Sequence, residues 1–189
     1  IFMSDSFDLQ HVNVKFFVKN ADAINLEDAI NVFHSWIRDQ KLDDLLIDVA
    51  DYRHVPSGPG VILVGHNAHY AFDNAESRLG VLYNRKSATD SKGADQIQKT
   101  IEAAQGICRL IAKEDAFAGK FEIASDCLQL IVNDRLLGAN TQESYERLLP
   151  EMTAALVRVF GEQDYQFERS SDPRKRLTVT VKVPNGVSI

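Results

Sequence analysis

The pattern of apolar and polar positions predicts three amphipathic helices along the chain. The first begins after Asn25, a residue type that favours the N-cap of a helix. The second carries apolar residues at helical spacing over residues 97–111. The third is expected to begin at Asn140, to be kinked or divided at Pro150, and to end at Gly161.

Runs of apolar residues between these helices predict the strands of a sheet. Residues 11–19 alternate apolar and polar positions, which is typical of a half-buried strand, whereas residues 45–50 form a continuous run typical of a more fully buried one. Because a helix separates them, we expect these two strands to run parallel through a crossover connection. Hairpins are predicted over residues 70–83, 121–132 and 165–183.

Together these elements predict an α+β fold with a mixed, mainly antiparallel sheet and three principal helices in one globular domain, residues 1–189. An internal similarity adds a further hypothesis, two related halves. Residues 70–84 and 165–182 share the order Tyr-x-Phe-acid, a polar turn, and Arg-Leu-x-Val. An ancient duplication would relate residues 11–86 to residues 94–183. The alternative is that two amphipathic hairpins simply follow the same pattern.

The charge balance argues against nucleic-acid binding. The 189 residues include 27 acidic and 21 basic side chains, a net charge of −6, whereas nucleic-acid-binding domains usually carry a basic surface. A dense basic cluster, residues 173–176, lies between two predicted strands, and we interpret it as a solvated hairpin turn. No stretch approaches the roughly 20 apolar residues of a membrane span, so we expect no membrane partner.

Cysteine usage and the first residues indicate a cytoplasmic protein. Cys108 and Cys127 are too few for a disulfide framework, and both fall at apolar positions where we expect buried free thiols. Residues 1–10 lack the basic and apolar segments of a signal peptide. We therefore expect a reducing compartment, with the cytoplasm as the default localisation.

The densest set of chemically active side chains lies in residues 48–78, around a Ser-Gly-Pro-Gly turn. Three of the chain's five histidines lie here, beside acidic residues where a predicted strand ends. Strand ends often border ligand clefts in sheets that contain parallel pairs. The candidate catalytic residues are Asp48, Asp51, His54 and His66. The candidate binding residues are Arg53, His54, His66, His69, Tyr70, Asp73 and Arg78.

Neither a phosphate-binding loop nor a metal site is favoured in this segment. Pro59 removes a backbone donor, Gly60 leads into a strand rather than a helix, and no glycine-rich phosphate motif is present. His66 and His69 would share one side only in a helical or turn-like segment, and no HExxH motif or cysteine pair supports them. We therefore predict no metal and no cofactor.

Acid–base catalysis and a structural turn are the two remaining interpretations. Asp48 or Asp51 could orient His54 or His66 as a base, although no nucleophile elbow accompanies them. In the structural interpretation, prolines stiffen the turn, glycines allow positive φ or close backbone contact, and arginines pair with the nearby acids. Rigid loops of this kind often form binding surfaces.

The run LLIDVADYRHVPSGPGVILVGHNAHY, followed by LYNRK, resembles a segment found in bacterial proteins of unknown function. The similarity extends over most of the chain, and its most specific part is DVADYxHVPxGPG…GH. It implies a bacterial cytoplasmic protein and carries no activity and no catalytic residue with it.

The sequence therefore favours a non-catalytic cytoplasmic binding or protein-interaction module. We expect the 51–73 loop to form its binding surface, and we expect a protein partner or self-association into a homo-oligomer. A small-molecule ligand is a further option. The alternative function is a hydrolase-like enzyme that acts on a small molecule through an Asp/His site in residues 48–73. In one version of this alternative, a metal ion assists the reaction.

Overall fold

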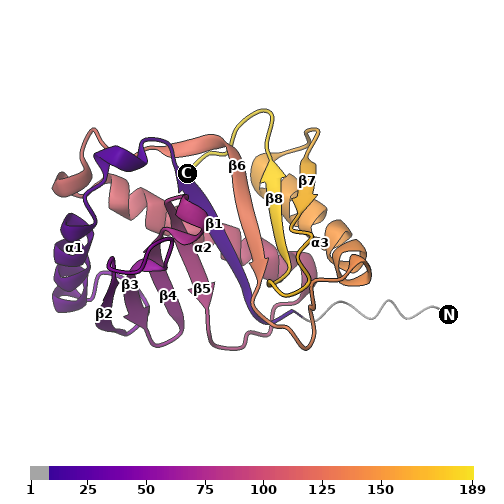
Figure 1. Cartoon of the computed structure of the whole chain (residues 1–189), viewed down its shortest axis with the longest axis horizontal. Helices are drawn as coiled ribbons and strands as arrows, with labels where there is room; N and C mark the ends of the chain where they lie inside the picture. The colour runs from indigo at the N-terminus through magenta and orange to yellow at the C-terminus, as the bar shows by residue number, and fades with distance from the viewer. Residues whose placement is uncertain (1–8) are drawn as a thin grey trace.

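The computed structural model describes residues 9–189, which form three α-helices and one eight-stranded sheet (Figure 1). Residues 1–8, where we expect no signal peptide, lie outside the described residues. The helices are α1 (Leu26–Asp39), α2 (Gly93–Ala112) and α3 (Gln142–Phe160). The strands are β1 (Val12–Val18), β2 (Leu46–Tyr52), β3 (Gly60–Gly65), β4 (Ala68–Asp73), β5 (Gly80–Arg85), β6 (Ile123–Val132), β7 (Gln166–Arg169) and β8 (Thr178–Lys182). Short 3₁₀ helices are η1 (Ala21–Ala23), η2 (Ala75–Ser77) and η3 (Asp115–Phe117).

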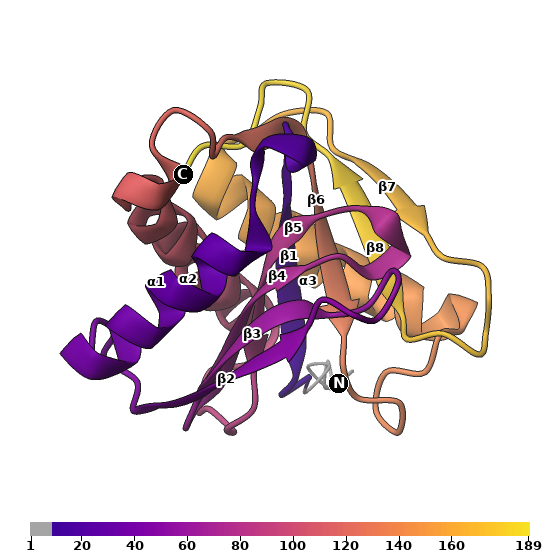
Figure 2. The ribbon, with the colours of Figure 1, turned by 60° about the vertical axis from the view of Figure 1, so that its left-hand side comes forward.

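The predicted α+β class is confirmed, and the sheet is antiparallel throughout. Its strand order is β2-β3-β4-β5-β1-β6-β8-β7, and each neighbouring pair is antiparallel. The expected crossover needs a correction here. β1 and β2 run in the same direction, but β3, β4 and β5 lie between them, so they are not parallel neighbours. Figure 2 shows the twist of the sheet, with β2 and β3 turned well away from the direction of β6.

The prediction of a more fully buried strand over residues 45–50 is wrong, because β2 is an edge strand. It pairs only with β3, and the register shifts between Leu46 and Asp48. This bulge places Ile47 outside the ladder, 54% exposed, while Leu46 remains in the core. A continuous apolar run does not reveal whether a strand has one neighbour or two.

The prediction of a hairpin over residues 121–132 is also wrong, because β6 is one continuous strand. The polar residues Ser125 and Asp126 lie inside it and are exposed, without a turn. Their carbonyl oxygens accept hydrogen bonds from the backbone N–H groups of Val187 (2.7 Å) and Val183 (2.8 Å). The C-terminal segment thus holds this part of the strand extended.

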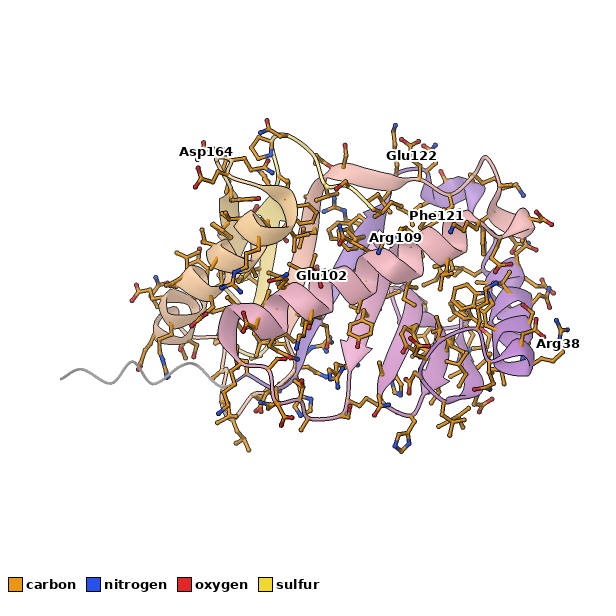
Figure 3. All side chains as sticks on the ribbon, turned by 180° about the vertical axis from the view of Figure 1, so that it is seen from behind. Arg38, Glu102, Arg109, Phe121, Glu122 and Asp164 are labelled. Carbon is orange, nitrogen blue, oxygen red and sulfur yellow. The ribbon has the colours of Figure 1, made fainter. Side chains whose placement is uncertain are left out.

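All three helices cover one face of the sheet, and the hydrophobic core lies between them. Figure 3 looks onto this face, with α2 and its labelled residues Glu102 and Arg109 in front of the strands. Phe33 of α1 packs on Phe72 of β4, with ring centroids 6.0 Å apart. The core strands contribute every second residue, such as Phe16 of β1, which is fully buried. Within residues 9–189, the other face of the sheet carries no α-helix, and we call it the open face (Figure 1).

The helix ends agree with the sequence patterns at two places and differ at one. Asn25 caps α1 by accepting a hydrogen bond from the Glu27 N–H (3.0 Å), as predicted, and Gly161 ends α3 with φ of +81°. The N-cap of α3 is Thr141 rather than Asn140, because the Thr141 hydroxyl accepts from the Ser144 N–H (3.2 Å). Pro150 lies inside α3, and the helix continues through it to Phe160.

The duplication hypothesis stays a prediction. The order β4-β5-β1 on one side of the sheet does mirror β7-β8-β6 on the other, about the central pair of β1 and β6. The hairpin β2–β3 has no counterpart in the second half. Within residues 9–189, no helix is long and apolar enough to cross a membrane.

Replacing Gly106 with alanine is expected to raise the free energy of unfolding by about 1 kcal/mol, because alanine costs less backbone entropy in a helix. Gly106 lies inside α2, and an added Cβ would meet only the Arg109 guanidinium, 3.9 Å away. Urea unfolding measures the effect. Gly60→Ala is the control: Gly60 has φ of +66° and its Cβ would overlap the Phe72 carbonyl, so that variant should lose stability. Equal effects of the two substitutions would contradict the account.

Candidate functional site

The structure does not bring the candidate catalytic residues together. His54 lies in the turn between β2 and β3, whereas His66 lies in the turn between β3 and β4. The whole of β3 separates these turns, and six residues of strand span about 20 Å. Asp48, Asp51, His54 and His66 are all exposed. A catalytic group of one carboxylate and two histidines therefore does not form in this segment.

The acids and arginines of the segment make local contacts instead. Asp51 pairs with Arg53 (2.9 Å), as expected, and this hydrogen bonding lowers the pKa of the exposed Asp51 carboxyl to about 2. Asp48 accepts only from the N–H of its neighbour Val49 (2.8 Å). His69 is half-buried on the open face of β4, and its burial lowers the pKa of its ring. These contacts support the interpretation of a structural turn.

The carboxylate that holds this region together is Asp44, which the sequence analysis did not single out. Asp44 is 8% exposed and accepts hydrogen bonds from the backbone N–H groups of Asn67 (2.9 Å) and Ala68 (3.0 Å) and from the Tyr70 hydroxyl (3.1 Å). An added Cβ at Gly65 would overlap the same carboxylate, so Gly65 makes room for it. Tyr70 is therefore a structural residue, and burial raises the pKa of its hydroxyl.

A basic concavity lies elsewhere on the described chain, at the centre of the open face. This open-face pocket has a volume of about 400 Å³. Its floor is formed by side chains of four adjacent strands: Lys15 and Phe17 of β1, Leu82 of β5, Gln129 and Ile131 of β6, and Thr178 and Thr180 of β8. Its rim is formed by Asp73, Ala75, Glu76 and Arg78 at the β4–β5 connection, by Arg135 after β6, and by Arg174, Lys175 and Arg176 of the β7–β8 loop.

A buried ion pair lies at the floor of the pocket. The Lys15 side chain is 2% exposed and donates to the Asp73 carboxylate at 2.6 Å, and that carboxylate also accepts from the Ala75 N–H (3.3 Å). Burial lowers the pKa of Lys15, while the charge of Asp73 opposes that shift. An added Cβ at Gly80 would overlap the Lys15 chain, so the glycine leaves the path that the lysine follows.

Arg78 lies over an aromatic ring at one end of the pocket. Its guanidinium carbon is 3.5 Å from the centroid of the Phe17 ring, and its Nη2 donates to the Cys127 sulfur (3.0 Å). Stacking on an aromatic face holds a guanidinium in place without neutralising its charge. The sequence-based expectation that Arg78 pairs with a nearby acid is therefore wrong, whereas Asp73 does form an ion pair, with Lys15.

The β7–β8 loop reaches over the pocket from the opposite end of the sheet. Asn140 anchors it, since its side-chain amide donates to the carbonyl oxygens of Ser170 (2.9 Å) and Asp172 (2.8 Å). At its tip Lys175 pairs with Glu76 of η2 (2.9 Å). Figure 1 looks onto the open face, where both connections lie in front of the strands. The two loops thus meet across the pocket, and their contact encloses the pocket on one side.

The pocket carries a local charge opposite to that of the whole chain. Its lining includes six basic side chains and two acidic ones, whereas the chain has a net charge of −6. Lys15 and Lys175 pair with the two acids, and Arg174 pairs with Asp172 (3.0 Å). Among the arginines that line the pocket, Arg78, Arg135 and Arg176 have no acidic partner within residues 9–189.

Sequence reasoning found part of this site. Asp73 and Arg78 were predicted to be binding residues, and both line the pocket. The basic cluster over residues 173–176 lies exposed in the β7–β8 hairpin connection, as predicted, and its three basic residues also line the pocket. The available signal was the polar alternation of Thr178 and Thr180 after the cluster, which places hydroxyls on the same face.

Comparison with known proteins adds no family to this picture: the chain matches no protein-family model and no curated protein. Among the described residues 9–189, no group of three or more histidine, cysteine, aspartate or glutamate side chains is placed to hold a metal ion. Cys108 and Cys127 are both buried free thiols, as predicted.

Proposed function

We propose that the protein is a non-catalytic binding protein that takes a small anionic ligand in the open-face pocket. The observation that carries this proposal is the convergence of six basic side chains from separate strands and loops on one concavity of an acidic chain. Arginine is well suited to phosphate and carboxylate groups, because its planar fork binds them bidentately. A volume of about 400 Å³ falls in the range of small-molecule sites.

The pocket's own chemistry favours binding over catalysis. Its lining residues include no histidine, and its two carboxylates are each paired with a lysine. A general base needs a free lone pair within hydrogen-bond reach of its target. The enzyme alternative in residues 48–73 has less support, because His54 and His66 lie at opposite ends of β3.

Calorimetric titration with pyrophosphate and citrate, at low and physiological salt, tests the proposal. We expect saturable binding that weakens with salt, and we expect Arg78→Gln to weaken it by about tenfold through loss of a charge-assisted contact. Arg109→Gln, on the helix-covered side of the molecule, is the matched control and should bind like the wild type (Figure 3). No binding of either anion, or equal losses in both variants, would overturn the proposal.

A second candidate function is self-association through the β2 edge and the adjoining 51–73 loop. Exposed large apolar residues gather here: Leu45 is 60% exposed and Ile47 54% exposed, and Tyr52 and Val55 follow. β2 offers unpaired backbone groups along one side, and an exposed apolar edge favours pairing with another strand. A protein partner at this edge would fit the same surface.

Sedimentation velocity tests the self-association. If β2 pairs two copies, the wild type should sediment as a dimer at micromolar concentration and Ile47→Lys as a monomer. Leu136→Lys, which changes an equally apolar and 96% exposed side chain after β6, should leave the dimer intact. A wild type that stays monomeric over the whole concentration range would remove this candidate.

A further inference from the structure

The strand register repeats about the central pair of β1 and β6. Outward from this pair, β5 and β4 follow β1 as β8 and β7 follow β6. Matching registers join β1 to β5 and β6 to β8: Val14↔Tyr83 and Phe16↔Val81 in the first, Leu128↔Val181 and Leu130↔Val179 in the second. A half-turn about an axis through the Lys15–Gln129 pair exchanges the two registers, and this axis also superimposes the two Arg-Leu-x-Val sequences. Both residues of that pair lie on the pocket floor.

The same correspondence makes Arg78 and Arg176 equivalent. Each precedes by two residues the first residue of its strand, Gly80 of β5 or Thr178 of β8. Each also begins the sequence Arg-Leu-x-Val. Both line the open-face pocket, and neither has an acidic partner within residues 9–189.

These two arginines approach the pocket from opposite ends. Gly80 pairs with Phe17 of β1. Thr178 pairs with Ile131 of β6, which in turn pairs with Asn13 of β1. Phe17 and Asn13 are four residues apart on one strand, a separation of about 13 Å. Arg135 lines the Arg176 end as well, since it follows β6.

We propose that the ligand carries two anionic groups, phosphates or carboxylates, one bound at the Arg78 end of the open-face pocket and the other at the Arg176 end. This rests on the proposed function, an anion-binding pocket, and deepens it by naming the ligand class. Between the two ends the floor offers the Thr180 hydroxyl, the Gln129 amide and the Leu82 side chain. Lys15 also lies on this floor, but Asp73 compensates its charge. The middle of the ligand is therefore uncharged, with hydrogen-bonding groups beside apolar ones.

A buried amide without a hydrogen-bond partner in residues 9–189 lies next to the pocket floor at the Arg176 end, since Asn13 pairs with the lining residue Ile131. Asn13 is fully buried on the same side of β1 as Lys15, and neither its Nδ2 nor its Oδ1 has a hydrogen-bond partner among the described residues. Burying an unbonded amide is costly, so most buried polar groups bind another protein group or an ordered water. By the half-turn correspondence Asn13 occupies the place of Cys127, whose sulfur accepts from Arg78.

The bridge between the two loops favours a small molecule over an extended polymer. Lys175 and Glu76 meet at 2.9 Å from opposite ends of the sheet, and both line the pocket. A polymer lying along the strands would have to pass beneath this contact or break it. A ligand confined to about 400 Å³ fits on the floor without doing so.

The test compares alkane bisphosphates of increasing chain length with alkyl monophosphates of the same lengths, by calorimetric titration of the full chain. We expect one bisphosphate length to bind at least about tenfold more tightly than its monophosphate. Arg78→Gln and Arg176→Gln should each remove that advantage. Arg78→Lys, which keeps the charge, should retain part of it, and Arg109→Gln should retain all of it. Thermal unfolding of each variant establishes that it is folded.

The outcomes separate this proposal from the proposed function. Equal affinity for bisphosphates and monophosphates, with both weakened by Arg78→Gln, would overturn the two-anion ligand and leave an anion-binding pocket. No binding of either series would overturn both. A single-stranded oligonucleotide that bound more tightly than every bisphosphate, and lost affinity in the same variants, would also overturn the proposal and assign the face to a polymer.

Discussion

Lys15→Met is expected to lower the free energy of unfolding by about 3 kcal/mol, because breaking a buried ion pair leaves an uncompensated charge. The Asp73 side chain is 9% exposed, and its other hydrogen bond, to the Ala75 N–H, is long at 3.3 Å. Methionine fills the lysine's space but offers no donor. Urea unfolding of the variant measures this loss of stability. The double variant Lys15→Met/Asp73→Asn should lose less free energy of unfolding than the sum of the losses in the two single variants.

The matched control is the second ion pair of the same pocket. Lys175 and Glu76 have side chains 55% and 65% exposed, and an exposed pair of this kind contributes at most about 1 kcal/mol. Lys175→Met should therefore leave the unfolding curve nearly unchanged. Similar losses in Lys15→Met and Lys175→Met would mean that burial does not distinguish the two pairs.

Asp44→Asn is expected to cost about 3 kcal/mol, because the new amide presents an NH₂ group to donors that need an acceptor. Both carboxylate oxygens of Asp44 accept hydrogen bonds, from Asn67, Ala68 and Tyr70. We expect a lower midpoint in urea unfolding and a disordered β3–β4 turn. Asp48→Asn, an exposed residue bonded only to its neighbour, is the control and should cost less than about 0.5 kcal/mol. An Asp44→Asn variant as stable as the wild type would contradict the role assigned to this carboxylate.

Elements with strong local sequence signals were predictable, but the segments that pair or pack beside them in the fold were not. The side-chain cap at Asn25 and the alternation from Leu177 to Val183 fix α1 and β8 from nearby residues alone. The misread segments are those where distant chain decides the outcome. β2 lacks a neighbour on one side, and Ser125 of β6 stays extended because Val187 bonds to it.

The candidate site was predictable only where its residues lay close in sequence. Asp73 and Arg78 were selected because they adjoin the histidine-rich turn, although they act with Lys15 and Phe17, which come from β1. Asp44 was missed because its partners are 23 to 26 residues away. A basic cluster such as residues 173–176 shows its chemistry in the sequence but not the face over which its loop folds.

The position of a bound anion tests the central claim most directly. Heteronuclear NMR spectra of the labelled protein, recorded during titration with an alkane bisphosphate, locate the residues that it contacts. We predict the largest shifts at the floor and both ends of the open-face pocket, including Lys15, Gln129 and Thr180. Largest shifts in residues 51–66, or no shifts at saturating probe, would contradict the claim that this pocket is the binding site.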